Sequence, residues 1–157
     1  MLTLINANRM RPPIAPIGLE YVAEAAQDQG IEVELLDLGL REDPGTLLAA
    51  YFSRRSPALV GISFRNVDDC FWPSATWFVP GLRGLVRQLR GLTDAPIALG
   101  GVGFSAFAAR VMDAAGADFG VHGDGEQAAV SLYRELRGDR AFETVDGLLW
   151  RRQGRIV

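Results

Sequence analysis

Short apolar runs and amphipathic stretches alternate along this chain of 157 residues, and this alternation limits the possible fold more than any other feature. The apolar runs have the length and composition of buried β-strands. They span residues 2–7, 31–37, 59–64, 96–101 and 117–121. The stretches between them place apolar residues three and four apart, as in an amphipathic helix. They span residues 17–29, 46–54, 74–89, 105–115 and 126–136.

A helix after every strand predicts a parallel sheet with right-handed crossovers. Five strands in a chain of this length favour the flavodoxin-like order 2-1-3-4-5 over a full Rossmann pair. Residues 147–152 and 155–157 flank Gln153 and Gly154, and this pattern predicts a β-hairpin at the C-terminus. We therefore expect a doubly wound α/β domain with a five-stranded parallel sheet and a C-terminal hairpin.

Composition argues against several classes of function. The net charge of −3 lacks the basic excess of a nucleic-acid-binding surface. All sixteen basic residues are Arg, so the chain has no Lys for a Schiff base or a Walker phosphate loop. Its first residues carry no signal-peptide pattern, and no apolar run approaches the length of a membrane span. We expect a cytoplasmic protein with neither a nucleic-acid nor a membrane partner.

Cys70 is the only cysteine, so the chain forms no internal disulfide and cannot by itself supply thiolates for an iron–sulfur cluster. No Cys–His pairing is visible, and an incidental thiol is favoured over a nucleophile. The neighbouring Asp68 and Asp69 are a candidate acid pair. Phe71 and Trp72 either cover a large planar ligand or anchor this long loop to the core.

Ligands of open parallel sheets bind beyond the carboxyl ends of the strands. The loops at that edge are 6–16, 64–76, 100–105 and 122–126. The glycines of 100–103 either let the backbone approach a ligand or simply make a tight strand-to-helix turn. In the turn at 122–126, Asp124 is a candidate helix cap. His122, the only histidine, is a candidate ligand or acid–base group, although no second His or Cys accompanies it.

Six segments carry a resemblance to a known family. They are residues 12–23 (PPIAPIGLEYVA), 30–37 (GIEVELLD), 60–64 (VGISF), 96–101 (PIALGG), 117–126 (ADFGVHGDGE) and 147–157 (GLLWRRQGRIV). In this order and at these intervals they resemble the N-terminal cobalamin-binding domain of B12-dependent radical S-adenosylmethionine (SAM) enzymes. The resemblance covers nearly the whole chain.

The resemblance implies that the corrin ring of cobalamin lies across the carboxyl ends of the strands and that its nucleotide tail enters a groove beside the sheet. Ser63 and the turn 100–105 would line the tail groove, and loops 8–13, 65–72 and 122–126 would face the corrin. The implied cofactor-binding residues are Asn8, Arg9, Met10, Ser63, Phe64, Arg65, Asn66, Gly100, Gly101, Gly103, Ser105, His122, Gly123, Gly125 and Glu126.

Two departures from the pattern refine this expectation. Many cobalamin domains carry Asp-x-His-x-x-Gly after the first strand, but residues 6–11 (NANRMR) contain no histidine. The resemblance then implies base-off cobalamin without a histidine ligand. The cysteine triad of radical enzymes is also missing, so a [4Fe–4S] cluster and SAM would belong only to a parent protein. We expect residues 1–140 to form the cobalamin domain and residues 141–157 to begin the connection to a radical SAM domain.

The leading hypothesis is a cobalamin-binding domain of a larger enzyme that performs methyl transfer or related radical chemistry and is not catalytic alone. One alternative is a cofactor-free docking domain of the same fold, whose groove would be filled by Phe64, Phe104 or Trp72. Another is a small flavodoxin-like enzyme or nucleotide binder. It ranks last, because Pro12 and Pro13 remove two backbone donors from the loop that would bind phosphate.

Overall fold

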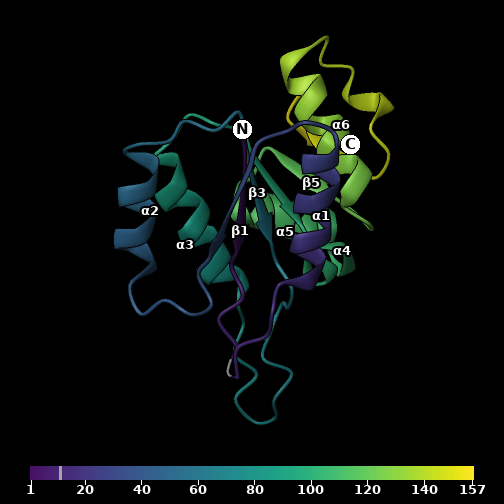
Figure 1. Ribbon diagram of the computed structural model, residues 1–157. Coiled ribbons are helices and arrows are strands. Elements are labelled where there is room, and N and C mark those ends of the chain that lie inside the picture. Colours follow the sequence, from purple (N-terminus) through teal and green to yellow (C-terminus); the bar gives the residue numbers. More distant parts are fainter. Residues whose placement is uncertain (11) are drawn as a thin grey trace.

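The computed structural model describes residues 1–10 and 12–157 and contains a single sheet covered by helices on both faces (Figure 1). The strands are β1 (Leu2–Asn6), β2 (Val33–Asp37), β3 (Leu59–Ser63), β4 (Ile97–Gly100), β5 (Phe119–Val121), β6 (Leu148–Arg152) and β7 (Arg155–Ile156). The helices are α1 (Ile17–Asp28), α2 (Pro44–Phe52), α3 (Val79–Arg90), α4 (Val102–Ala106), α5 (Ala108–Ala115), α6 (Glu126–Arg137) and the 3-10 turn η1 (Phe142–Thr144).

The strand order is β2-β1-β3-β4-β5-β6-β7, and the first five strands are parallel. The predicted doubly wound order 2-1-3-4-5 is therefore confirmed. The predicted C-terminal hairpin is present, and it also joins the main sheet, because β6 pairs antiparallel with β5. Val145 and Leu148 are buried in the same core as α6, which explains why the hairpin stays on the sheet.

Alternate residues of the central strands face two separate cores. Ile5, Ile62 and Leu99 pack against α2, α3 and α5 on one face. Leu4 and Ala98 pack against α1 and α6 on the other face. Figure 1 shows α2 and α3 together on one side and α1 and α6 on the other. Because the strands are buried on both faces, their sequences read as continuous apolar runs.

The helix expected over 46–54 lies at Pro44–Phe52, and two other helix predictions differ more from the structure. The helix expected from residue 74 begins at Val79, because residues 67–78 pair with each other instead. Asp68 and Trp77 form an antiparallel bridge, and the Phe78 N–H donates to the Val67 carbonyl at 2.8 Å. The helix expected over 105–115 is split into α4 and α5 by Phe107, whose φ of −142° is incompatible with a helix.

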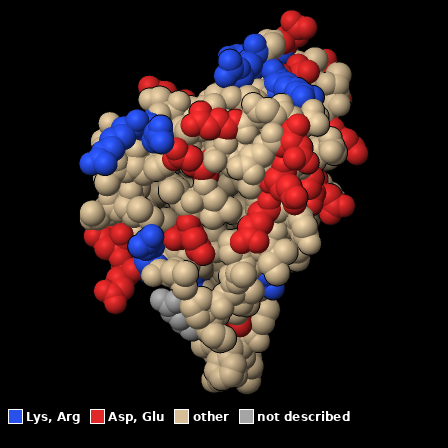
Figure 2. Space-filling view, in the orientation of Figure 1, with Lys and Arg blue, Asp and Glu red and all other residues tan. Residues whose placement is uncertain are grey.

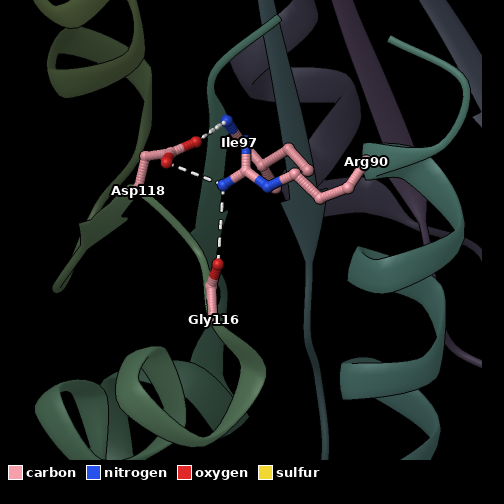
Figure 3. Close-up of polar contacts among 4 residues, drawn as sticks. All are labelled: Arg90, Ile97, Gly116 and Asp118. Carbon is pink, nitrogen blue, oxygen red and sulfur yellow. Dashed lines mark hydrogen bonds and ion pairs between the residues drawn. The ribbon is translucent and has the colours of Figure 1, made fainter. Parts of the chain in front are cut away.

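A polar contact at the amino-terminal edge of the sheet ties three elements together (Figure 3). Asp118, just before β5, accepts a hydrogen bond from the Ile97 N–H at 2.8 Å and pairs with Arg90 of α3 at 2.7 Å. The Arg90 guanidinium also donates to the Gly116 carbonyl at 3.5 Å. These contacts orient the start of β4 and β5, at the opposite end from the loops that follow the strands.

Among the described residues, no helix has both the length and the apolar character needed to cross a membrane.

Candidate functional site

A groove of about 440 Å³ opens at the carboxyl ends of the strands and runs between the sheet and helices α1 and α6. Two other hollows, of about 380 and 510 Å³, lie around Asp94 and Arg140 near the opposite edge. Both are lined by Asp94 and Arg140. The first groove is the better candidate, because it lies where ligands of doubly wound sheets bind and its walls are mostly apolar.

The floor of the groove is a patch of small residues on adjacent strands. Leu4 pairs with Gly61, and Gly61 pairs with Ala98. Two residues further along the strands, Ser63 pairs with Gly100. Gly61 leaves a hollow that a side chain would fill, since an added Cβ would lie 2.8 Å from Cδ2 of Leu4. A glycine within an apolar strand is a signal of such close approach.

The two walls come from helices. Ile17, Gly18 and Val22 of α1 form one wall, and Ala129 of α6 forms part of the other. Gly125, before α6, packs so closely that an added Cβ would lie 3.1 Å from Val22. Ile14 and Ile17 remain exposed at the mouth, so the entrance offers apolar surface to a ligand.

The glycines of the turn after β4 have different roles. Gly101 has a φ of 98°, and an added Cβ would lie 3.0 Å from the Phe64 carbonyl oxygen. At Gly103 an added Cβ would lie 2.7 Å from the backbone of Arg65 and Asn66. Both glycines are therefore required by a tight turn against the loop after β3. Gly100 is not, because its Cβ would meet nothing nearer than 3.9 Å.

The turn after β5 is held to the turn after β4. The Gly123 N–H donates to Oγ of Ser105 at 3.1 Å. The expected cap at Asp124 is wrong: the N-cap of α6 is Gly125, and it makes no side-chain capping bond. Asp124 lines the groove instead, together with Glu126 of the first turn of α6.

A polar cluster closes the ends of β1 and β2 beside the groove. The side-chain amide of Asn6, which is 3% exposed, donates to Oδ1 of Asp37 at 2.9 Å. The Asn6 side-chain oxygen accepts from the Asn8 N–H at 3.1 Å, and Asp37 Oδ1 also accepts from the Gly39 N–H at 2.8 Å. These three hydrogen bonds fix the direction in which the chain leaves β1 and β2.

The loop after β3 has charged groups with unusual environments. A hydrogen bond from the Ser74 hydroxyl lowers the pKa of Asp69 to about 2. Asp68 raises the pKa of the Cys70 thiol by accepting its hydrogen bond at 3.2 Å. A thiol held protonated is a poor nucleophile, so the geometry supports the incidental reading of Cys70. Asp68 and Asp69 each bond their own loop and do not form an acid pair.

The structure brings most of the candidate residues to one place. Those that line the groove are Asn8, Ser63, Arg65, Gly100, Gly101, Ser105, Gly123, Gly125 and Glu126. Those that do not line it are Arg9, Met10, Phe64, Asn66, Gly103 and His122. Phe64 points into the core on the other face of the sheet, and His122 is exposed. The Asn66 side-chain oxygen is buried without a hydrogen-bond partner among the described residues.

Sequence reasoning missed the residues that shape the groove itself. Leu4, Gly61, Ala98, Val22 and Ala129 line it, and none of them belongs to a strand-end loop. Gly61 was the available signal, because glycine is otherwise unfavourable in a central strand. The aromatic rings proposed as a plug do not fill the groove: Phe64 and Phe104 are buried on the other face, and Trp72 is 86% exposed.

Among the described residues, no group of three or more His, Cys, Asp or Glu side chains is placed to hold a metal ion. The apolar walls of the groove and the few polar side chains at its mouth suit an organic ligand that enters with an apolar portion.

Comparison with known proteins agrees with this geometry. Residues 4–133 match the model of the B12 binding domain. The chain is 36% identical over 145 residues to a tryptophan 2-C-methyltransferase of Streptomyces laurentii, and the match covers 92% of this chain but only 24% of that protein. The chain thus spans about a quarter of the curated relative.

Solved structures give the same result. The radical SAM methyltransferase TsrM from Kitasatospora setae, with cobalamin and a [4Fe–4S] cluster bound, is 37% identical, with a TM-score of 0.94 over 99% of this chain and 30% of TsrM. The cobalamin-dependent SAM radical enzyme OxsB with aqua-cobalamin bound has a TM-score of 0.77 at 16% identity. The match covers 99% of this chain and 21% of OxsB, and it shows a similar fold. By the extent of the family match, the chain belongs to the B12-binding domain family.

Proposed function

We propose that this chain binds cobalamin as the cofactor domain of a larger B12-dependent radical SAM methyltransferase. The observation that carries the proposal is the open, mostly apolar groove in a domain that superimposes closely on TsrM. The proposal extends from the family to this chain because the groove has not been filled by larger side chains. Gly61, Ala98 and Gly100 keep its floor low.

The residues present fit the two parts of the cofactor. The deep part of the groove, over Gly61 and Ala98 and between α1 and α6, suits an elongated tail. The mouth, with exposed Ile14 and Ile17, offers apolar contact to a broad ring. Backbone donors and the Ser63 and Ser105 hydroxyls would meet the polar groups of the tail. Arg65 stands at the rim as a cation that could meet a phosphate or the ring's polar margin.

We propose that the cofactor is held without a histidine ligand. The described part of loop 6–11 contains no histidine, and His122 lies outside the groove lining. Its backbone N–H donates to the Gly147 carbonyl at 2.9 Å, which ties this residue to the start of the hairpin. Affinity then rests on the groove and the mouth rather than on a bond to the metal.

The radical step would be performed outside this domain. Cys70 cannot supply the thiolates of a [4Fe–4S] cluster, so the cluster and SAM would be bound by the remainder of the larger enzyme. Cobalamin would supply methyl-carrying chemistry, while the domain would bind and orient it. Residues 1–140 would form the cofactor domain, and residues 141–157, folded onto β5, would lead towards the radical SAM domain.

The related tryptophan methyltransferase suggests an aromatic amino acid or a similar small molecule as the methyl acceptor. We propose a cytoplasmic setting and no nucleic-acid partner; the net charge of −3, which lacks the basic excess of a nucleic-acid-binding surface, supports the second part.

Retention of the cofactor tests the proposal directly. The purified chain is mixed with hydroxocobalamin, desalted, and examined by visible absorbance. We expect about one equivalent of corrin to remain bound, because the groove buries an apolar ligand surface. A protein that emerges colourless at micromolar concentrations would contradict the proposal.

A matched pair of variants locates the binding site. Gly100→Leu should project a side chain into the groove without a clash, since the nearest atom to its Cβ is 3.9 Å away. We expect cobalamin affinity to fall at least about tenfold, because the added side chain occupies groove volume that the cofactor needs. Gly84→Leu makes the same chemical change in α3, on the other face of the sheet, where an added Cβ meets nothing within 4 Å. That control should bind like the unchanged protein.

A further inference from the structure

The loop after β3 exposes an unusual set of aromatic side chains. We name residues 67–78 the aromatic ribbon. Phe71 is 64% exposed, Trp72 is 86% exposed and Trp77 is 54% exposed. Figure 1 shows this loop, in teal, projecting below the carboxyl ends of the strands. In Figure 2 the same end of the molecule is almost bare of charged side chains.

The ribbon is held in a defined shape by its own hydrogen bonds. Asp68 accepts from the Cys70 N–H at 2.9 Å, and Asp69 accepts from the Phe71 N–H at 3.1 Å. The Ser74 hydroxyl donates to Asp69 at 2.7 Å, and the Asp69 N–H donates to the Thr76 carbonyl at 3.1 Å. Cys70 adopts a φ of 51°, a value that few non-glycine residues accept.

Ordered, exposed aromatic residues are characteristic of binding surfaces. Trp and Tyr dominate the energetics of protein interfaces, and contiguous exposed apolar surface on a soluble domain marks a contact site. A loop already held in shape loses little conformational entropy when it binds. The ribbon therefore has the properties of a preformed anchor rather than those of a solvent-exposed connection.

The ribbon does not serve the groove itself. The groove lining includes Arg65, at the start of the loop, but no residue of 67–78. A membrane surface is a poor occupant too, because the ribbon has no Lys or Arg to meet anionic headgroups and carries the acidic Asp68 and Asp69. What remains is a protein surface that offers an apolar hollow, with basic side chains to face the two carboxylates.

The position of the ribbon identifies that protein surface. Groups that react must approach within about 3–3.5 Å. The part of the enzyme that binds the cluster and SAM must therefore cover the mouth of the groove, at the carboxyl ends of the strands. The ribbon projects from this same end (Figure 1). We propose that the aromatic ribbon docks onto the cluster- and SAM-binding portion of the enzyme and fixes its position over the cofactor, an inference that rests on the proposed function.

Oxidative footprinting of the intact enzyme tests the docking. Hydroxyl radicals are generated in samples of the isolated chain and of the intact enzyme that contains this domain, and oxidation is measured for each residue by mass spectrometry. Docking should slow the oxidation of Trp72 roughly tenfold, because burial of an interface anchor removes nearly all of its accessible surface. Tyr51 on α2, far from the ribbon, serves as the internal control and should be unchanged.

Further samples separate the competing occupants. Hydroxocobalamin added to the isolated chain should leave Trp72 oxidation unchanged, as should vesicles of phosphatidylcholine and phosphatidylglycerol. Protection by cobalamin would mean that the ribbon covers the corrin, and protection by vesicles would mean that it meets a membrane; either result overturns the proposal. Equal oxidation of Trp72 in the isolated chain and the intact enzyme would overturn it as well.

A pair of variants distinguishes failure of docking from failure of cofactor binding. The double variant Phe71→Ala and Trp72→Ala should retain cobalamin in the isolated chain but lower SAM-dependent methyl transfer by the intact enzyme at least about tenfold, as expected for loss of interface anchors. Leu35→Ala removes an apolar side chain that is 36% exposed on β2 and should change neither property. Loss of cobalamin in the double variant, or undiminished methyl transfer, would contradict docking. A failure of the unchanged chain to bind cobalamin would instead contradict the proposed function.

Discussion

The hydroxyl of Ser105 accepts a hydrogen bond from the backbone N–H of Gly123 at 3.1 Å, and this contact joins the turn after β4 to the turn after β5. Both residues line the groove. They are 18 positions apart in the sequence, and only the parallel pairing of β4 with β5 brings the two turns together. The contact therefore holds the two turns together at this corner of the groove.

Replacing Ser105 by Ala should loosen that corner without unfolding the protein. A hydrogen bond of this kind contributes about 0.5–1.5 kcal/mol, so the amide of Gly123 should exchange with solvent roughly two- to tenfold faster. Hydrogen exchange followed by NMR measures this change, and cobalamin affinity should fall by a similar factor. Ser53→Ala, which removes a hydroxyl that bonds the Ala50 carbonyl on α2, is the control. An unchanged Gly123 exchange rate would show that the contact is unimportant.

Removing the only histidine should not change the environment of bound cobalamin. His122 is exposed and lies outside the groove lining, so we expect His122→Ala to retain cobalamin with the same absorbance spectrum. Electron paramagnetic resonance of the reduced cofactor is the sharper measurement, because a nitrogen ligand splits the cobalt signal. A loss of such splitting in the variant would identify His122 as a ligand and refute the histidine-free assignment.

Asn6 should be among the more sensitive polar positions of the chain. Its buried side chain bonds both Asp37 and the Asn8 N–H, so Asn6→Ala removes the side-chain acceptor of the Asn8 N–H and one of the two donors to Oδ1 of Asp37. We expect a loss of about 1–3 kcal/mol in the free energy of unfolding, measured by urea denaturation. Asn8→Ala removes a single bond, from the Met10 N–H, in a less buried place and should cost less. Equal losses in the two variants would argue against a special role for Asn6.

The pKa of Asp69 should depend on Ser74. The native pKa of about 2 lies below the ordinary value of 3.8, so the carboxylate stabilises the aromatic ribbon above about pH 4. This contribution is lost as the pH falls from 4 through 2. Ser74→Ala should raise the pKa of Asp69 towards 3.8, which a carbon-13 NMR titration of the side chain measures. A titration curve that does not move would show that the Ser74 hydroxyl is not the cause.

Much of the fold was open to prediction from local pattern. The apolar runs of β1, β3 and β4 and the amphipathic stretches of α1 and α6 are strong periodic signals, and Gly116, with a φ of 76° at the end of α5, is a clear stop. The boundaries of α3 and α4 were less accessible. The pairing of Asp68 with Trp77 prevents a longer helix, and the local sequence pattern does not predict this pairing.

The candidate site was likewise predictable only in part. Several polar and glycine candidates at strand ends, such as Ser63, Gly101 and Gly123, do line the groove, because a parallel sheet gathers its carboxyl ends on one edge. Leu4, Val22 and Ala129 were missed, since each looks in the sequence like an ordinary core residue. Whether such a residue lines a groove or fills a core depends on how far its neighbours stand from it.

By itself, the sequence determined the order of strands and helices, the loops that meet at one edge, and the absence of thiolates for a cluster. The tertiary structure alone decided that β6 extends the sheet, that Phe64 and Phe104 turn to the opposite core, and that a groove remains open beside Gly61. The physical reason is that strand and helix periodicity is a property of neighbouring residues, whereas an open space is a property of side chains from distant segments that fail to touch.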